Sequence, residues 1–370
     1  MKFSYWENKT WLSNIDFVIV GSGIVGLSCA LQLRLKHPAS KIVILEKGLL
    51  PYGASTRNAG FACFGSLTEI ISDLQSHSDQ EVFELIKKRV SGLNKLRELL
   101  GDKEIKYQQL GGNEIFLHNE EEKLNLSIDN LDRVNNLIRP LFDGEVFHVV
   151  ENKFKFNNTL NKLIFNKYEG QIDTGEMMDS LLKKAHSCGI RIINNVSLEG
   201  FEDLKSSVLL KTNQFTIKCR KLFIATNGFS NSIIQENVVP ARAQVLITKP
   251  IKNLNIAGTF HLDEGYYYFR NIDNRILLGG GRNLDFQSEN TTEFGLTKVI
   301  QSKLERLLKE VILPETHFEI EQRWSGIMGV GKKKTAISKQ LSNNVYCGVR
   351  LGGMGIAIGT NVGIELAELL

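Results

Sequence analysis

A glycine-rich hexapeptide, GSGIVG at residues 21–26, leaves this chain few ways to begin its fold. The apolar run 15–20 before it predicts a buried parallel strand. After it, apolar residues recur at helical spacing from Ile24 until Pro38 stops the helix, and the apolar run 41–45 predicts the next strand. The order of these elements predicts a β-α-β unit.

Each glycine of the hexapeptide has a physical role in a dinucleotide-binding turn. Gly21 permits the tight turn, Gly23 lets a pyrophosphate approach the backbone, and Gly26 allows the helix to pack closely on the strand. The helix N-terminus presents free N–H groups and a positive dipole to the phosphates. Glu46 ends the second strand 20 residues after Gly26, where a carboxylate accepts ribose hydroxyls. A purely structural glycine turn is the alternative, and the flanking strand, helix and acid favour dinucleotide binding over it.

Two further glycine-rich segments indicate FAD as the dinucleotide. The loop 53–60, GASTRNAG, is small, polar and flexible, so it can wrap a pyrophosphate and reach a flavin ring. Near the C-terminus five glycines fall within residues 348–359, more than a strand-to-helix turn needs. Such a density of glycine predicts that a ligand lies against the backbone there, and we expect the pyrimidine end of the flavin.

Length and composition restrict the class of protein. At ~150 residues per domain, the 370 residues predict about two domains. The net charge of +4 comes from scattered basic residues, so we expect no nucleic-acid partner. The five cysteines are odd in number and widely separated, which predicts free thiols in a reducing compartment and no metal site.

The apolar run 17–31 is too short to cross a bilayer, which needs ~20 apolar residues, and it lacks a signal-peptide cleavage site. A cytoplasmic location without stable membrane insertion is therefore expected.

The rest of the chain predicts a discontinuous organisation. Amphipathic helices are expected at 79–100 and 120–138, with short strands at 105–109 and 114–117. A helix that Gly189 stops and a strand at 190–193 follow, then strands at 208–212, 215–218 and 222–225, a hairpin with strands 266–270 and 275–281, a strand at 345–349 and a helix ending at Leu370. The arm 1–14 carries Tyr5, Trp6 and Trp11, which predicts that it lies against the body of the protein.

The assembled motifs resemble the D-amino-acid oxidase-like family of FAD-dependent oxidoreductases, which includes glycine oxidase, sarcosine oxidase and gamma-glutamylputrescine oxidoreductase. The resemblance covers nearly the whole chain. Its anchors are DFVIVGSGIVGLSCALQL at 16–33, GASTRNAG at 53–60, EGQIDTGEMMDSLLKKAHSCGIRI at 169–192, LFIATNGFS at 222–230, YYYFRNIDNRILLGGG at 266–281, and RWSGIMG with GVRLGGMGIAIG near the end.

The resemblance implies an α/β fold: an FAD-binding Rossmann-type (glutathione-reductase-like) domain with a discontinuous α+β substrate domain built on a mainly antiparallel sheet. It places the FAD-binding domain at 14–66, 150–228 and 322–370, and the substrate domain at 67–149 and 229–321. The residues it implies for the cofactor are Gly21, Gly23, Ile24, Val25, Gly26, Glu46, Lys47, Ser55, Thr56, Arg57, Asn58, Val196, Thr226, Gly228, Arg350, Gly353, Met354, Gly355 and Ile356.

For the substrate the resemblance implies a pocket walled by the tyrosine hairpin, with Tyr267, Tyr268 and Arg282 as candidate catalytic residues and Tyr267 as the preferred tyrosine. Plain packing of the hairpin is the alternative for any one tyrosine. The implied chemistry passes a hydride from a substrate C–H beside an amine or hydroxyl to the flavin.

Departures from the family pattern restrict the substrate. The arginine that follows W-x-G in glycine-oxidase-like members is replaced by 327–329, Ile-Met-Gly. The lysines of sarcosine-oxidase-like members are replaced by Leu277 or Leu278 and by Ala357, which argues against oxidase activity. A substrate carboxylate is left to Arg57, Arg282 or Arg350, although each also suits a surface or phosphate-binding role.

Two other features have alternatives of their own. The lysines at 332–334 suit either an anion or a solvated face. Cys63 and Cys347 suit either covalent flavin attachment or, more ordinarily, buried thiols.

The function expected is oxidation of the C–N bond of a small-molecule amine or amino acid, with an unknown electron acceptor. A 2-hydroxy-acid dehydrogenase on the same scaffold and a flavin-bearing subunit of a larger complex are the alternatives.

Overall fold

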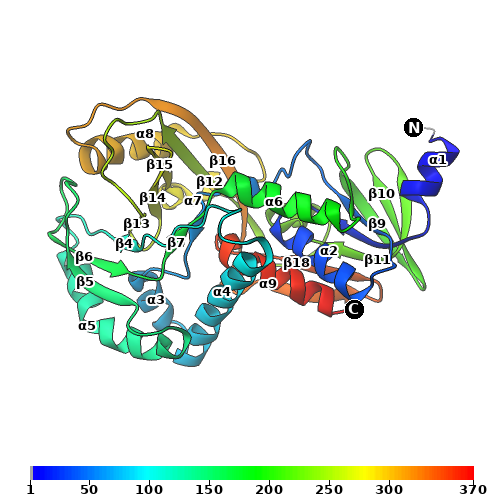
Figure 1. Cartoon of the computed structure of the whole chain (residues 1–370), viewed down its shortest axis with the longest axis horizontal. Helices are drawn as coiled ribbons and strands as arrows, with labels where there is room; N and C mark the ends of the chain where they lie inside the picture. Colours follow the sequence, from blue (N-terminus) through cyan, green and yellow to red (C-terminus); the bar gives the residue numbers. More distant parts are fainter. Residues whose placement is uncertain (1–2) are drawn as a thin grey trace.

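The computed structural model describes residues 3–370. The fold contains two large sheets, each built from segments that are far apart in the sequence (Figure 1). Among these residues, none of the helices has both the length and the apolarity that crossing a bilayer requires. In Figure 1 the first sheet lies on the right with α2, and the second lies on the left. The helices α4 (Asp79–Leu100) and α9 (Gly355–Glu368) pack against each other between them.

The first sheet is built around the predicted β-α-β unit. Its main path runs β17-β18-β11-β1-β2-β8, and β10 and β9 extend it antiparallel from β11. The five central strands are parallel, with β1 between β11 and β2. The strands are β1 (Ile15–Val20), β2 (Ile42–Leu45), β8 (Arg191–Ile193), β9 (Leu198–Leu204), β10 (Ser207–Thr212), β11 (Thr216–Ile224), β17 (Ile337–Ser342) and β18 (Val345–Val349).

Helices cover one face of this sheet. α2 (Ile24–Lys36) packs against α9 and against α6 (Thr174–Ser187). Gly363 of α9 allows the closest approach, since a Cβ there would lie 2.6 Å from the Val25 carbonyl oxygen. Gly189 ends the α6 segment with φ +69°, as the sequence predicts.

The second sheet is mainly antiparallel and has the order β16-β12-β15-β14-β13-β4-β6-β5, with only β13 and β4 parallel to each other. Its strands are β4 (Gly112–Glu114), β5 (Phe147–Glu151), β6 (Lys162–Asn166), β12 (Val239–Thr248), β13 (Thr259–Leu262), β14 (Tyr267–Ile272), β15 (Arg275–Gly280) and β16 (Ile320–Val330). One core cluster joins it to α8 (Lys298–Leu307), and another joins it to α3 (Leu67–Leu74) and α5 (Glu121–Ile138).

Shorter elements complete the chain. They are α1 (Tyr5–Glu7), η1 (Asn8–Leu12), η2 (Ala54–Thr56), β3 (Phe61–Ala62), η3 (Arg139–Leu141), β7 (Gly170–Gln171), η4 (Asn227–Ser232), η5 (Arg282–Leu284), α7 (Phe286–Glu289) and η6 (Leu308–Ile312). The strands β3 and β7 pair with each other as a small separate ribbon.

Three local predictions are wrong. The segment 105–109 is a turn with a single bridge at Gln108, because it caps the α4 end instead of pairing along a sheet. The strands expected at 215–218 and 222–225 are one strand, β11, because β10 and β1 pair with successive parts of it. The strand expected at 114–117 is not continuous: β4 ends at Glu114, and Leu117 forms only an isolated antiparallel bridge with Thr159.

The N-terminal arm lies against the body of the protein, as predicted, but its three large aromatic residues are exposed. Residues 1 and 2 lie outside the described part, and Tyr5, Trp6 and Trp11 are 67%, 67% and 44% exposed. The arm is held by other contacts: Phe3 packs edge-on against Phe215 at 5.4 Å, and Lys41 Nζ donates to the Ser13 carbonyl at 2.6 Å.

The domain boundaries stay a prediction, and the sheets differ from them at two places. Both β6 and β16 are strands of the second sheet, although the sequence-based boundaries assign 162–166 and most of 320–330 to the FAD-binding domain. Their partners β4 and β12 are distant in sequence, which is why local patterns do not reveal the pairing.

Candidate active site

The turn between β1 and α2 has the geometry that the glycine motif predicts. Gly21 has φ +102°, and a Cβ there would lie 2.8 Å from the Ala225 carbonyl oxygen. A Cβ on Gly26 would lie 1.9 Å from the Gly21 carbonyl oxygen, so helix and strand touch through bare backbone. The hydroxyl of Ser55, from the loop 53–60, accepts the Ile24 N–H at 3.1 Å. The start of α2 therefore presents its backbone donors close to the loop 53–60, and Ser55 occupies one of them.

Glu46 is held at the end of β2 by four hydrogen bonds. Its Oε2 accepts the N–H and the hydroxyl of Ser22 at 2.9 and 2.6 Å, and its Oε1 accepts the N–H groups of Gly48 and Tyr52 at 2.9 and 3.2 Å. The side chain is 4% exposed and lines the main cavity. These bonds fix the carboxylate at the place where the motif expects ribose hydroxyls.

A cavity of about 1120 Å³ runs from this turn to the second sheet. It brings together most of the predicted residues: Gly21, Gly23, Ile24, Val25, Glu46, Lys47, Ser55, Arg57, Asn58, Val196, Thr226, Tyr268, Arg282, Gly353, Met354, Gly355 and Ile356. These residues come from segments far apart in the sequence, so the cavity depends on the whole fold.

Three observations fit an elongated dinucleotide in this cavity. The Thr226 hydroxyl is buried, lines the cavity and has no hydrogen-bond partner among residues 3–370. The Val196 N–H is used by the Glu46 carbonyl at 2.9 Å, which leaves the Val196 carbonyl for a base edge. Gly352 and Gly353 have φ +60° and +84°, so the backbone before α9 follows a path that side-chain-bearing residues avoid.

Five predicted residues do not line the cavity: Gly26, Thr56, Gly228, Tyr267 and Arg350. Gly26 has the packing role described above. Gly228 likewise permits close packing, since a Cβ would lie 2.4 Å from the Met328 carbonyl oxygen. The Thr56 hydroxyl donates to the Pro51 carbonyl at 2.8 Å and shapes the loop.

Arg350 is a structural residue, contrary to its predicted contact with cofactor or carboxylate. Its Nε and Nη1 donate to the carbonyls of Thr335 and Asn237 at 3.0 and 3.2 Å. Its own N–H donates to Asn227 Oδ1 at 3.0 Å. The guanidinium thus ties three loops together and is 8% exposed.

One face of the second sheet forms the far wall of the cavity. Cross-strand pairing aligns Glu114, His261, Tyr268, Gly279, Val245 and Trp324 in one row from β4 to β16. Of this row, His261, Tyr268 and Val245 line the cavity. Burial raises the pKa of Tyr268 to about 12, so its hydroxyl stays protonated and can donate.

The preference for Tyr267 is wrong because successive residues of a strand face opposite sides. Tyr267 is 5% exposed and packs in the core under α8, where Lys303 Nζ lies 5.7 Å from its ring centroid. Tyr268 takes the cavity side. The same alternation directs Leu277 toward Ala59 of the loop 53–60, and directs Leu278 into the core cluster under α8.

Arg282 is the predicted carboxylate partner that the structure leaves most available. It lines the cavity, its Nη2 donates to Asn290 Oδ1 at 3.1 Å, and its buried Nε has no partner among the described residues. Burial lowers the pKa of Arg282. Arg282 also stacks on Phe286, whose ring centroid lies 4.8 Å from its guanidinium carbon. Arg57 donates to the Ser325 carbonyl at 3.1 Å and stacks on Phe294 at 4.3 Å.

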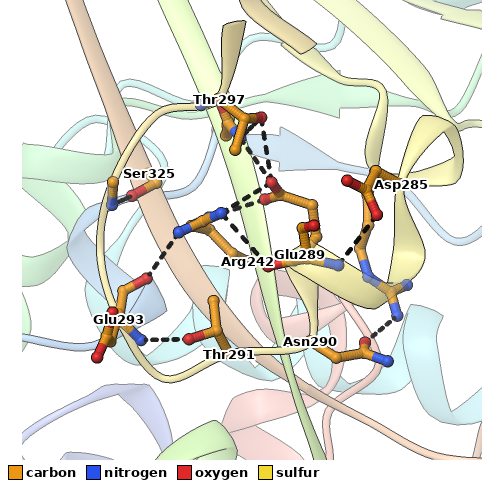
Figure 2. A network of polar contacts seen from close by, with 12 residues as sticks. Arg242, Asp285, Glu289, Asn290, Thr291, Glu293, Thr297 and Ser325 are labelled. Atoms are coloured by element: carbon orange, nitrogen blue, oxygen red, sulfur yellow. Dashed lines mark hydrogen bonds and ion pairs between the residues drawn. The ribbon is translucent and has the colours of Figure 1, made fainter. Parts of the chain in front are cut away.

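The segment 281–297 carries Arg282 at the rim and is held by a buried network (Figure 2). Glu289 is fully buried; its two oxygens accept Arg242 Nε and Nη2 at 2.8 and 2.9 Å, and Oε1 also accepts Gln244 Nε2 at 3.0 Å. Burial works to raise the pKa of Glu289, but the bonds from Arg242 and Gln244 outweigh it and the pKa lies below its ordinary value. Sequence patterns do not reveal this network, because β12 and the segment are distant in the chain.

A cluster of charged residues that the sequence analysis did not identify also lines the cavity. Lys334 Nζ lies 2.6 Å from Asp73 Oδ1 and 3.3 Å from Glu69 Oε1, and Arg89 also pairs with Glu69 at 3.1 Å. Burial works to raise the pKa of Glu69, yet Arg89 and Lys334 together lower it. Lys332 and Lys333 line the cavity beside this cluster, so the lysine run borders the site instead of lying on a remote face.

Arg270 holds the loop 53–60 in place, and sequence patterns did not identify this residue. Its Nη1 donates to the carbonyls of Gly60 and Ile172 at 2.9 and 2.6 Å, and it is 3% exposed. Burial lowers the pKa of Arg270 to about 10. The guanidinium therefore joins the second sheet to the loop 53–60.

The cysteines are all free, as the sequence predicts. Cys63 lines the cavity, and burial raises its pKa well above the ordinary value, with Glu169 and Glu69 adding to the effect. Burial raises the pKa of Cys347 to about 11. Both are therefore protonated, weakly reactive thiols at neutral pH.

A buried histidine completes the cavity wall and was not foreseen. His261 Nε2 lies 2.6 Å from Glu169 Oε1, and the Thr259 hydroxyl donates to the same oxygen at 2.7 Å. His261 is 8% exposed and Glu169 1% exposed. Phe61 packs edge-on against the imidazole at 5.3 Å, which places the pair next to the cofactor loop.

Comparison with known proteins agrees with this geometry. A family model described as FAD dependent oxidoreductase matches residues 16–369. The probable oxidoreductase OrdL of Haemophilus influenzae is 19% identical over 384 residues, covering 98% of this chain and 84% of that protein. The mitochondrial L-2-hydroxyglutarate dehydrogenase of Bos taurus is 23% identical over 310 residues, covering 76% of this chain and 64% of that protein.

Solved structures share the fold. L-proline dehydrogenase from P. horikoshii superposes with a TM-score of 0.76 at 18% identity, covering 96% of this chain and 93% of that chain. Glycine oxidase from Geobacillus kaustophilus gives 0.75 at 18% identity, covering 96% and 94%.

Proposed function

This chain belongs to the family of FAD dependent oxidoreductases, and from that premise we propose that it oxidises the C–N bond of a small amine or amino acid. When bound, FAD accepts a hydride from the substrate carbon. The turn at the start of α2, Glu46 and the Thr226 hydroxyl would hold its dinucleotide part. The backbone at 353–356, where α9 begins, would lie along the flavin.

The observation that carries the proposal is a guanidinium in the same cavity as the dinucleotide turn. Arg282 lines the cavity, and among the described residues only the Nη2 of its guanidinium makes a hydrogen bond, to Asn290 Oδ1 at 3.1 Å. A carboxylate can bind the remaining N–H groups of such a guanidinium in a two-pronged bond. Tyr268 offers a hydroxyl donor from the neighbouring strand. Together they would orient an α-carboxylate so that the adjacent carbon faces the flavin-side loop.

A second candidate, oxidation of a 2-hydroxy acid, is favoured by the His261–Glu169 pair in the cavity wall. Loss of a hydroxyl proton needs a base, and a buried histidine held by a carboxylate is suited to that role. Among the relatives, L-2-hydroxyglutarate dehydrogenase bears a name that fits this chemistry.

We propose a dehydrogenase and not an oxidase. Leu277 packs against Ala59 where sarcosine-oxidase-like members are expected to carry a lysine that assists the reaction with oxygen. We further propose that the electron acceptor is a group other than oxygen and that the protein acts in the cytoplasm. Oxygen consumption by the reduced enzyme, compared with reduction of an artificial acceptor such as a phenazine dye, tests this part.

Anaerobic bleaching of the yellow enzyme tests the substrate class. The panel holds glycine, L-proline, iminodiacetate and L-2-hydroxyglutarate, and we expect one of the amino compounds to bleach the flavin. Arg282→Lys is expected to raise the substrate concentration for half-maximal rate at least ~10-fold, since a lysine cannot make the two-pronged bond. Bleaching by the hydroxy acid alone would replace the first candidate with the second.

Arg275→Lys is the matched control. Arg275 pairs with Glu321 outside the cavity at 2.8 Å and is expected to leave bleaching unchanged. If Arg282→Lys has wild-type kinetics, Arg282 does not bind the substrate.

A further inference from the structure

One nitrogen of the His261 imidazole is hydrogen-bonded within the protein, and the other is not. Its Nε2 hydrogen-bonds to Glu169, which fixes the tautomer and the plane of the ring. Its Nδ1 has no hydrogen-bond partner among residues 3–370, and it is not one of the atoms sealed from solvent. Because the rest of the side chain is buried and lines the cavity, the space that Nδ1 reaches is the cavity.

The position of the ring relative to other cavity residues is fixed by strand pairing. His261 on β13 is directly opposite Tyr268 on β14, and paired residues of this kind have Cβ atoms ~4.5–5.5 Å apart on the same face. The imidazole and the Tyr268 ring therefore lie on the same wall of the cavity, where each packs edge-on against Phe61 at 5.3 and 5.5 Å.

We propose that Nδ1 of His261 accepts the proton that the substrate's amine or hydroxyl group loses as the neighbouring carbon is oxidised, with Glu169 as the positioning residue. This inference rests on the proposed function. It names the base of that site, which neither the sequence motifs nor the relatives' names assign.

The step balances in both substrate classes. With a hydroxy acid, the O–H proton passes to Nδ1, the C–H bond breaks with its electron pair going to the flavin as hydride, and the product is a ketone. With an amino acid, the ammonium group first gives one proton to Nδ1, and the same hydride loss leaves an iminium. In each case the substrate loses two electrons, and His261 becomes an imidazolium that Glu169 stabilises.

Acidic groups face His261 from several elements. Glu169 precedes β7, Glu114 is its partner on β4, and Glu69 of α3 also acts on it. Burial works to lower the pKa of His261, but Glu169 and Glu114 outweigh it, so the pKa lies above the ordinary value of 6.5. Burial raises the pKa of Glu114, whose carboxylate accepts the Thr68 N–H at 3.2 Å.

The direction of the pH dependence follows from these charges. A base must be unprotonated before it can act, so the proposed step fails as pH falls through the raised pKa of His261. Removal of the Glu169 charge lowers that pKa and moves the acid limb of the rate to lower pH. A residue that only supported the fold would leave the position of the limb unchanged.

The first experiment reads the histidine itself in the FAD-loaded protein. Histidine labelled with ¹³C at Cε1 is titrated by NMR, and the His261 signal is identified by its loss in His261→Asn. We expect a pKa above 6.5 that falls in Glu169→Gln. A wild-type value at or below 6.5, or one that Glu169→Gln does not move, would overturn the inference whatever the substrate panel shows.

The second experiment measures anaerobic bleaching against pH with whichever panel compound reduces the wild type. His261→Asn and His261→Gln are expected to lower the rate at least ~100-fold, within the range that general bases contribute. With an amine, raising the pH above the substrate's own pKa restores part of the rate, whereas with a hydroxy acid it does not. A rate that stays within a few-fold of wild type in both variants would also overturn the inference.

Two controls separate the possible failures. His186→Asn changes an exposed histidine of α6 and is expected to alter neither the rate nor the titration of His261. The flavin absorbance of each variant reports whether the cofactor site is intact. If no panel compound bleaches the wild type, the proposed function fails, and the NMR titration still decides whether Glu169 holds His261 as a base.

Discussion

The hydroxyl of Ser55 accepts the backbone N–H of Ile24 at 3.1 Å. The loop 53–60 is thereby attached to the first turn of α2, the helix that we propose receives the dinucleotide.

Ser55→Ala is expected to weaken FAD binding about 5- to 10-fold, because a hydrogen bond of this kind contributes about 1 kcal/mol. Titration of the apoprotein with FAD, followed by quenching of flavin fluorescence, measures the change. Ser187→Ala on α6, where the hydroxyl donates only to the Lys184 carbonyl of its own helix, is the control. Equal affinity in Ser55→Ala and wild type would show that the hydroxyl has no part in cofactor binding.

Gly26→Ala is expected to yield protein with little or no bound FAD. The added Cβ would lie 1.9 Å from the Gly21 carbonyl oxygen, so β1 and α2 must move apart. Overpacking costs about 1–3 kcal/mol, and more where only backbone can yield. The absorbance ratio at 450 and 280 nm reports the FAD content. Gly200→Ala on β9, where a Cβ meets nothing within 4 Å, should keep full FAD content.

Tyr268→Phe and Tyr267→Phe are expected to behave differently despite being neighbours. Tyr268 lines the cavity, so loss of its hydroxyl should weaken substrate binding about 2- to 10-fold, the equivalent of one neutral hydrogen bond. Tyr267 packs under α8, so its variant should affect only stability. Bleaching rates at varied substrate concentration distinguish the two. The reverse result would mean that the hairpin register is different from the one described.

Glu289→Gln is expected to destabilise the protein by about 3–5 kcal/mol at neutral pH, because Arg242 would be left buried without its counter-charge. Urea unfolding measures the change. Glu319→Gln, which breaks the exposed Lys249–Glu319 pair, should leave the free energy of unfolding almost unchanged.

The difference in the free energy of unfolding between wild type and Glu289→Gln is also expected to depend on pH. The pKa of Glu289 is lower in the folded protein than its ordinary value of 4.5, so its charge stabilises the fold above that value. This stability is lost as pH falls through the lowered pKa. The difference between wild type and Glu289→Gln should therefore shrink in acid, and a difference that stays constant would contradict the assigned ion pair.

Local sequence patterns were sufficient for the dinucleotide half of the site. The glycine turn, α2 and Glu46 lie within about 30 consecutive residues, so spacing alone indicates their arrangement. The hairpin was also predicted, but alternation along a strand gives two sets of side chains without saying which set faces the cavity. That is why Tyr267 was preferred and Tyr268 lines the cavity.

Contacts between distant segments could not be predicted in the same way. Glu169 and His261 are 92 residues apart, and Glu289 meets Arg242 across 47 residues. Neither pair follows a helix or strand period, because each depends on how β6, β12 and β13 are ordered in the second sheet. The exposed Tyr5, Trp6 and Trp11 show another limit: aromatic composition alone does not imply burial.

The packing of α9 against α2 has a consequence for synthesis on the ribosome. The turn that receives FAD is made within the first 26 residues, but the helix that covers α2 and the strand that completes the sheet beside β11 lie beyond residue 344. Until those residues emerge, the part of α2 that packs against α9 has no permanent cover, although α6 is already present to cover another part. Loading of FAD is therefore expected to follow the arrival of α9, after the chain has been made.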